Sequence, residues 1–328
     1  MNSSPLIDIR NLTVMFNTPA GELIAVDRVD LTLDRGETLG IVGESGCGKT
    51  VLAMSILGLL PTSRTRVSAD RLSFDGLDLR ELSSRRWRTI RGRRISIILQ
   101  DPTTALNPLR TIGSQVDEAI SIHSPSLSTR EIRRRSIELM ESVGIHDASE
   151  TLTEYPHQWS GGMRQRALIV MAISNSPDVV IADEPTTALD VTIQAQVLEL
   201  LRTIQKDRSL GMIFISHSLG VVSSMANRVS VMYAGRIVES GPCSEVLLLP
   251  THPYSRALVG CSPDISNPKK RLTTIEGFPP RVIGQSSGCR FRTRCDVGHD
   301  RPDCANQDPL LRATTVGRNV ACHVVESS

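Results

Sequence analysis

The sequence lacks a long apolar run, and its N-terminus has no targeting signal. The longest apolar stretch, residues 51–61, is about half of what a helix needs to cross a bilayer, roughly 20 residues. Residues 1–12 contain no basic segment followed by an apolar one, as a secretory signal would. We therefore expect a cytosolic chain that reaches a membrane only through other proteins.

An excess of one charge is also missing. The 328 residues contain 37 Lys and Arg against 35 Asp and Glu, with 11 against 7 from residue 251 onward. Six arginines surround Trp87 within residues 85–94, but acidic residues flank this run and its spacing is helical, which favours a solvated helix face. A nucleic-acid partner is therefore not expected. Hydrophobic residues make up 40% of the chain, which is enough for a packed core.

A glycine loop follows the apolar run at residues 39–42. The pattern Gly43-x-x-x-x-Gly48-Lys49-Thr50 lies between this run and a stretch of helix formers, and strand, loop and helix are the context in which such a loop binds phosphate. Backbone N–H groups and the helix N-terminus would hold phosphate oxygens, Lys49 would reach the β- and γ-phosphates, and Thr50 would ligate Mg²⁺. A chance glycine turn would not require the flanking strand and helix. The ATP contacts predicted here are Gly43, Glu44, Ser45, Gly46, Cys47, Gly48, Lys49 and Thr50.

A second apolar run ends in two acidic residues. Residues 179–182 predict a buried strand that delivers Asp183 and Glu184 to its carboxyl end. A Mg²⁺ ligand followed by a base that polarises water has this form. A single acid could end a strand in a solvated turn, but the pair, in a chain with a phosphate loop, favours ATP hydrolysis. Asp183 is then the metal ligand and Glu184 the base.

Between these segments lies Ser160-Gly161-Gly162-Met163. With the three motifs in this order, the sequence closely resembles the ATP-binding subunits of ABC transporters. The resemblance implies an α/β phosphate-loop core with an antiparallel β subdomain and an α-helical subdomain. It also implies that two ATPase subunits face each other head to tail, so that Ser160, Gly161 and Gly162 of one contact the ATP held by the other. ATP and Mg²⁺ are the implied cofactors.

The resemblance assigns roles to four further residues. Gln100 matches the loop that touches Mg²⁺ and the attacking water, and His217 matches the histidine that contacts the γ-phosphate. Asp190 matches the loop that communicates across the dimer, and Phe16 lies where the family places an aromatic ring under adenine. Taken alone, Gln100 could be a polar residue at a strand end, His217 an ordinary buried ring and Phe16 a core residue.

The ABC ATPase domain is expected over residues 6–250. Within it, residues 6–40 alternate as short antiparallel strands, and the pattern is helical from 101 to about 173, matching the family's helical subdomain. Residues 194–206 predict a helix with Val197, Leu198, Leu201 and Ile204 on one core-facing stripe. No internal repeat is visible, so the second ATPase subunit is expected to come from another chain. We expect a different chain, which makes a heterodimer, and a homodimer is the alternative.

Residues 251–328 form a predicted irregular extension. The strings "DPTTALNP", "HPYSRAL" and "GCRFRTRC" resemble the dipeptide, oligopeptide and nickel branch of bacterial ABC importers. This implies a peripheral ATPase on the cytoplasmic face of the inner membrane, with two transmembrane permease subunits and an extracytoplasmic substrate-binding protein as partners. Peptides are the expected solute, and nickel, glutathione or opines are alternatives. A non-transport ABC ATPase and a redox-sensing ATPase are rival functions from other classes.

Four of the seven cysteines lie in this extension, at Cys289, Cys295, Cys304 and Cys322. Thiols in the cytosol are kept reduced, so disulfides are disfavoured. Four thiolates suit zinc or an iron–sulfur cluster, and the tight C-x₂₋₄-C pairs usual for zinc are missing. The resemblance implies a 4Fe-4S cluster, because some members of the branch carry one. Zinc, with His299 and His323 as spare ligands, and reduced structural thiols remain alternatives.

Overall fold

A computed structural model describes residues 4–187, 189–261, 274–284, 287–314 and 317–325. Parts of the predicted 251–328 extension therefore lie outside the described residues. The chain divides into two compact units. The first contains residues up to 34, 38–80 and 214 onward, and the second contains residues 35–37 and 81–213.

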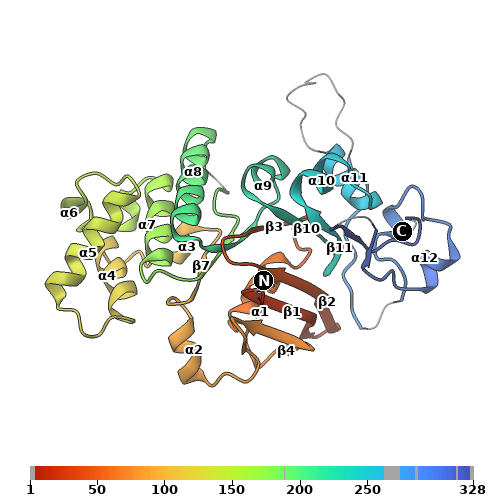
Figure 1. Ribbon diagram of the computed structural model, residues 1–328, viewed down its shortest axis with the longest axis horizontal. Helices are drawn as coiled ribbons and strands as arrows, with labels where there is room; N and C mark the ends of the chain where they lie inside the picture. The colour runs from red at the N-terminus through yellow and green to blue at the C-terminus, as the bar shows by residue number, and fades with distance from the viewer. Residues whose placement is uncertain (1–3, 188, 262–273, 285–286, 315–316, 326–328) are drawn as a thin grey trace. The chain divides into compact units, whose positions relative to one another are not determined.

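An antiparallel sheet opens the first unit (Figure 1). Its strand order is β2-β1-β5-β6, and β4 also pairs with β1. The long pair is held in register from Ile7 opposite Leu33 to Thr18 opposite Gly21, which confirms the antiparallel strands predicted in residues 6–40. The strands are β1 (Ile7–Thr18), β2 (Gly21–Leu33), β4 (Thr65–Ser68), β5 (Arg71–Phe74) and β6 (Leu77–Asp78).

A second set of strands in this unit runs in the order β12-β13-β11-β10-β3. Strands β3 and β10 are parallel and almost wholly buried, which is why both are nearly continuous apolar runs in the sequence. A tight turn at Ala234 and Gly235, both with positive φ, joins β10 to β11. The strands are β3 (Thr38–Val42), β10 (Arg228–Tyr233), β11 (Arg236–Pro242), β12 (Arg312–Ala313) and β13 (Asn319–Val320).

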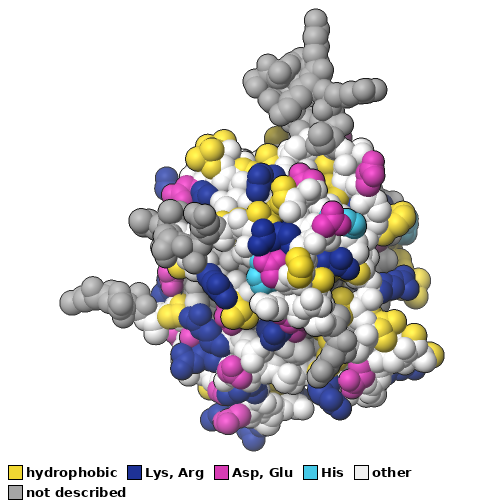
Figure 2. All heavy atoms as spheres, turned by 90° about the vertical axis from the view of Figure 1, so that its right-hand side faces the viewer, with side chains coloured by type: hydrophobic (Ala, Val, Ile, Leu, Met, Phe, Trp, Pro, Cys, Tyr) yellow, Lys and Arg dark blue, Asp and Glu magenta, His cyan; other side chains and the backbone are white. Residues whose placement is uncertain are grey.

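The helices of the first unit are short. They are α1 (Lys49–Ile56), α9 (Leu219–Met225), α10 (Cys243–Leu248), α11 (Pro253–Gly260), the 3₁₀ turn η2 (Arg292–Arg294) and α12 (Pro302–Asn306). On the face drawn in Figure 2, basic and acidic side chains are interspersed with apolar ones rather than gathered by sign. This agrees with the near balance of charge in the sequence.

The second unit is mainly helical. A capping box of Ser128 and Glu131 starts α5, where the serine side chain accepts from the backbone and the glutamate reaches back. The buried stripe predicted within α8 is confirmed. The helices are α2 (Ser84–Ile90), α3 (Pro102–Ala105), α4 (Ile112–Ser121), α5 (Thr129–Ser142), α6 (Ala148–Thr151), η1 (Pro156–Gln158), α7 (Gly161–Ile173) and α8 (Val191–Arg208).

Two parallel strands accompany these helices, β7 (Ile95–Ile98) and β8 (Val179–Asp183). Strand β9 (Gly211–Ile215) begins in the second unit and ends in the first. The arginines of α2 are exposed, as predicted for the run at 85–94, and the Arg91 guanidinium lies 4.5 Å from the centre of the Trp87 ring. None of the helices in the described residues is long and apolar enough to cross a membrane.

Candidate active site

The glycine loop runs from the end of β3 to the start of α1. Gly43 and Gly48 have φ values of 155° and 109°. A Cβ atom would lie 2.1 Å from the Met232 carbonyl oxygen at Gly43 and 2.3 Å from the Ala25 carbonyl oxygen at Gly48. No side chain fits at either point, so the two glycines fix the path of the loop.

Lys49 closes this loop onto itself. Its Nζ donates to the carbonyl oxygens of Gly43 at 2.9 Å and of Glu44 at 3.0 Å, and the residue is only 6% exposed. Helix α1 begins at this lysine and has no acid in its first turn, so its positive end faces the loop uncompensated. Thr50 is exposed at the same end. The arrangement is an anion-binding loop with one buried cation.

Two side chains from beyond residue 250 hold Glu44. The backbone N–H of Glu44 donates to the Tyr254 hydroxyl at 2.9 Å, and its carboxylate accepts from both terminal nitrogens of Arg294, at 2.8 and 3.0 Å. Sequence reasoning missed both partners. Tyr254 lies in "HPYSRAL" and Arg294 in "GCRFRTRC". In the sequence these segments indicate a branch of importers but no contact with the phosphate loop.

A pocket adjoins the loop in the same unit. It is bounded by Ser45 and Gly46, by the β1–β2 turn including Thr18, and by residues 278–283. The last segment pairs with β2, since the Ile24 N–H donates to the Val282 carbonyl at 2.9 Å. Phe16, predicted under adenine, is half-buried and lies two residues before Thr18, on the same side of β1.

His217 follows β9 and is exposed. The N–H of its neighbour Ser216 donates to the Ile41 carbonyl at 3.2 Å. The histidine therefore lies near the carboxyl end of β3, where the glycine loop begins. A buried ring, the alternative considered for a lone histidine, is excluded by this exposure.

In the second unit, the acidic pair ends β8 as predicted. Asp183 is 2% exposed, whereas Glu184 is half-buried and has a φ of 47°, the left-handed region that a residue with a side chain seldom adopts. The Glu184 carboxylate accepts from Gln100 Nε2 at 3.0 Å and from the Thr187 hydroxyl at 2.9 Å. The structure thus brings Gln100 and Glu184 together. Thr187 was not predicted, although it stands in the same motif.

The Ser-Gly-Gly motif starts helix α7. Ser160 is the exposed N-cap, and its hydroxyl accepts from the Met163 N–H at 3.3 Å. Asp190 caps α8 in the same way through the Ile193 N–H at 2.9 Å. Gly161 is exposed, but Gly162 is buried, and a Cβ there would lie 2.6 Å from the Ile193 side chain. Gly162 therefore also serves packing between α7 and α8.

The four C-terminal cysteines are free thiols, half-buried or buried. Burial and the nearby sulfurs of the other three raise the pKa of Cys289 to about 11. Gly298 donates its N–H to Cys295 Sγ at 3.2 Å, and a Cβ at this glycine would lie 3.2 Å from the sulfurs of both Cys295 and Cys304. Nevertheless, across the described ranges no group of three or more His, Cys, Asp or Glu side chains is arranged to hold a metal ion.

Comparison with known families matches two consecutive regions. The ABC transporter family model covers residues 26–187. The model for the C-terminal region of oligopeptide/dipeptide transporters covers residues 238–304.

Relatives match over most of the chain. It is 42% identical over 319 residues to the dipeptide transport ATP-binding protein DppD of Escherichia coli K12, covering 97% of this chain and 96% of the relative. It is 47% identical over 290 residues to DppD of Bacillus subtilis, covering 88% and 86%.

Solved structures of cassettes share the fold. A dimeric bacterial ABC transporter cassette, MJ0796, matches with a TM-score of 0.64 at 25% identity, covering 72% of this chain and 98% of that one. The cassette cbiO1 of Clostridium perfringens matches with a TM-score of 0.63 at 26% identity, covering 75% and 92%.

Proposed function

The chain belongs to the ABC transporter family, and from that premise we propose that it is the ATP-hydrolysing subunit of a bacterial importer of di- or oligopeptides. The observation that carries the ATPase role is the glycine loop with its buried lysine at the start of α1. The names of the relatives and the matched C-terminal region support peptides as the solute.

In this proposal, the phosphate loop binds ATP through its amides, and Lys49 exchanges its contacts with loop carbonyls for the β- and γ-phosphates. Thr50, Gln100 and Asp183 would hold Mg²⁺, which neutralises phosphate charge when bound. Glu184 polarises the attacking water, and its contact with Gln100 couples the two residues. Positioning and charge neutralisation dominate such phosphoryl transfer.

His217 would contact the γ-phosphate, and the pocket beside Ser45 and Gly46 would receive the base or ribose, with Phe16 near its rim. The exposed N-caps Ser160 and Asp190 are free to meet a second subunit. Ser160, Gly161 and Gly162 would then complete the site of a facing ATPase chain. The dimeric state of the MJ0796 cassette supports this arrangement.

We further propose that residues 6–250 act as the ATPase domain and that residues from about 101 to 173 dock on two permease subunits at the cytoplasmic face of the inner membrane. A substrate-binding protein outside that membrane would select the peptide. A second, different ATPase chain would complete the dimer.

Although the four cysteines are not arranged around a metal ion in the described ranges, two observations support a 4Fe-4S cluster held by them. Their thiols influence one another electrostatically, and the missing side chain of Gly298 leaves room beside two sulfurs, to one of which its N–H donates. Such N–H···S contacts tune clusters. Cys289, Cys295, Cys304 and Cys322 would hold the cluster, which would supply a redox-active centre. Zinc at the same thiols is the alternative, and metal analysis after anaerobic purification separates the two.

Hydrolysis by the assembled complex tests the proposal. The chain, purified with its permeases and partner ATPase, should hydrolyse ATP faster when the binding protein carries a dipeptide than when it is empty or carries nickel. Glu184→Gln should lower kcat at this site at least about 100-fold while ATP still binds, because the base is lost and the phosphate loop is intact. Glu81→Gln, at an exposed position outside the proposed docking segment, is the matched control. Retained turnover in Glu184→Gln would refute the assignment of the base.

A further inference from the structure

A short segment between two cysteines reaches back to the phosphate loop. Cys289 and Cys295 bracket Arg290 and Arg294, and the side chain of each arginine is only 5% exposed. Both guanidinium groups therefore donate hydrogen bonds to residues inside the first unit. Neither the ATP-hydrolysis reaction nor the cysteines account for the burial of these two arginines.

Every N–H of the Arg294 guanidinium has an acceptor. Two contacts go to the Glu44 carboxylate, one goes to the Tyr233 hydroxyl at 3.2 Å, and two go to the carbonyls of Ile275 and Glu276 at 3.2 and 2.8 Å. Arginine has five such donors, so this side chain is fully satisfied. A paired, parallel contact with a carboxylate fixes direction as well as charge. Glu44 is therefore held at a defined place.

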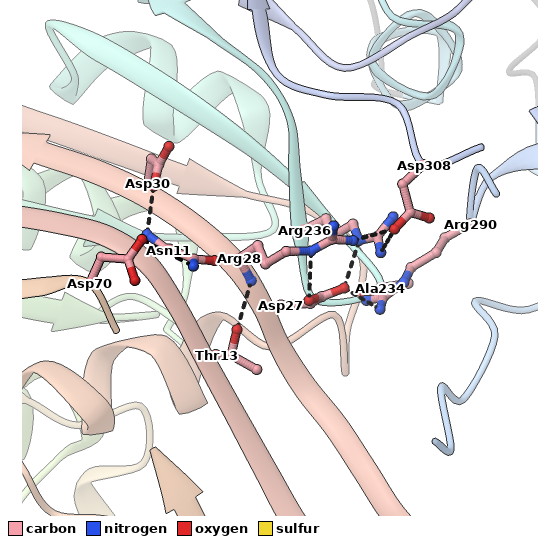
Figure 3. A network of polar contacts seen from close by, with 10 residues as sticks. All are labelled: Asn11, Thr13, Asp27, Arg28, Asp30, Asp70, Ala234, Arg236, Arg290 and Asp308. Carbon is pink, nitrogen blue, oxygen red and sulfur yellow. Dashed lines mark hydrogen bonds and ion pairs between the residues drawn. The ribbon is translucent and has the colours of Figure 1, made fainter. Parts of the chain in front are cut away.

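Arg290 anchors the other end of the segment (Figure 3). It donates to Asp27 on β2 and to the carbonyl of Ala234 at the β10–β11 turn. The next residue of that turn, Gly235, donates its N–H to the Cys47 carbonyl of the phosphate loop at 2.8 Å. Arg294 thus contacts the phosphate loop directly at Glu44. Arg290 contacts the β10–β11 turn, which itself binds the loop at Cys47.

Glu44 is a negative charge within a loop that binds a polyanion. Without a counterion, its carboxylate would repel the phosphates that the neighbouring amides attract. Arg294 neutralises that charge, and Tyr254 ties down the backbone N–H of the same residue. Loss of Arg294 would therefore both loosen the loop and expose a like charge to the ligand.

We propose that Arg294 is a positioning residue for ATP: it masks the Glu44 carboxylate and, with Tyr254, fixes the phosphate loop in its binding conformation. The C-terminal segment is thereby a structural part of the nucleotide site. The inference rests on residues 43–50 being the phosphate loop.

ATP titration of the full-length chain tests it. Arg294→Met should raise the Kd for ATP at least about tenfold, and in the assembled complex it should raise KM for ATP much more than it lowers kcat. Arg294→Lys should restore part of the affinity because it keeps the charge but not the paired geometry. Arg292→Met is the control, because this arginine lies in the same turn but its side chain donates to the His299 carbonyl at 3.3 Å and not to the loop. This variant should bind ATP as the unaltered chain does.

A second substitution separates charge from folding. If the exposed carboxylate repels phosphate, Glu44→Gln added to Arg294→Met should recover several-fold of the lost affinity, which a general folding defect would not allow. Equal Kd values for Arg294→Met and Arg292→Met, or no recovery in the double variant, would overturn the inference. Lys49→Ala should abolish binding; if it does not, the loop assignment fails instead.

Discussion

At the scale of single residues, Gly162 has a packing role beyond its place in the Ser-Gly-Gly motif. The Ile193 side chain occupies the space that a Cβ would need, whereas a Cβ at Gly161 would meet only Leu189 at 3.6 Å, an ordinary contact. Two adjacent glycines in one motif thus differ in whether the structure has room for a side chain at their position. The difference is a property of α7 and α8 and needs no nucleotide.

Gly162→Ala should therefore lower the free energy of unfolding by roughly 1–3 kcal/mol, because the added methyl forces Ile193 or the helix backbone to move. Gly161→Ala is the matched control and should be neutral or slightly stabilising. Urea unfolding of both variants measures the difference. Equal stabilities would mean that the helices adjust at no cost.

The sequence could indicate Lys49, Glu184 and Ser160 because each belongs to a short contiguous motif whose chemistry is local. It could not indicate Arg294, since this arginine lies 250 positions from Glu44 and nothing in one sequence links the two. The left-handed backbone of Glu184 was equally hidden. Such conformations depend on surrounding contacts rather than on residue type.

At the scale of elements, helix α11 is held at its start by buried polar groups. Glu239 on β11, fully buried, accepts from the N–H groups of Thr251 and His252 at 2.9 Å each. His252 is the N-cap, and its Nδ1 accepts from the Tyr254 N–H at 3.0 Å. Burial first, and then the charge of Arg256, lower the pKa of this histidine to about 3.

The depressed pKa of His252 predicts a loss of stability in acid. Below about pH 6.5 the unfolded chain binds a proton at this histidine that the folded chain rejects, so stability is complete above pH 6.5 and falls as the pH drops toward 3. The slope is at most about 1.4 kcal/mol per pH unit. Urea unfolding at pH 7.5 and 5.5 measures it.

His252→Asn should flatten this dependence, because asparagine can still cap the helix but does not titrate. The quantity to compare between the variant and the unaltered chain is the change in unfolding free energy with pH, not the unfolding free energy itself. If the variant and the unaltered chain lose the same stability between the two pH values, His252 is not the cause.

At the scale of the whole molecule, the proposed ATP site is one that a single chain cannot complete alone. Ser160 is exposed at the N-cap of α7, and we expect it to meet the γ-phosphate on a facing subunit. Ser160→Asp keeps a good N-cap but adds a negative charge where that phosphate should arrive. It should abolish ATP-driven association with the partner ATPase in a Glu184→Gln background.

Ser160→Asn, which caps equally well and is neutral, should retain most of the association. Sedimentation or cross-linking with and without ATP distinguishes the two variants. Association of Ser160→Asp at the level of Ser160→Asn would place the serine away from the phosphate.

Much of the fold was predictable because its elements carry regular apolar patterns: alternation in the second half of β2, continuous burial in β3 and β8, and a single stripe on α8. The C-terminal part was not predictable in this way. It is held by arginine contacts with distant carboxylates and carbonyls, such as Arg290 with Asp27, and these leave no periodic trace.

The turn at Ala234 and Gly235 has a consequence for engineering. Hairpin tips usually tolerate insertions because little depends on them. At this tip, Gly235 donates to Cys47 of the phosphate loop and accepts from the Asp27 N–H, while the Ala234 carbonyl accepts from Arg290. A tag or label inserted there would break the hydrogen bonds that join this turn to the phosphate loop, to strand β2 and to the cysteine-flanked segment. A hairpin tip that looks like an ordinary surface turn in the sequence is therefore a poor site for insertion.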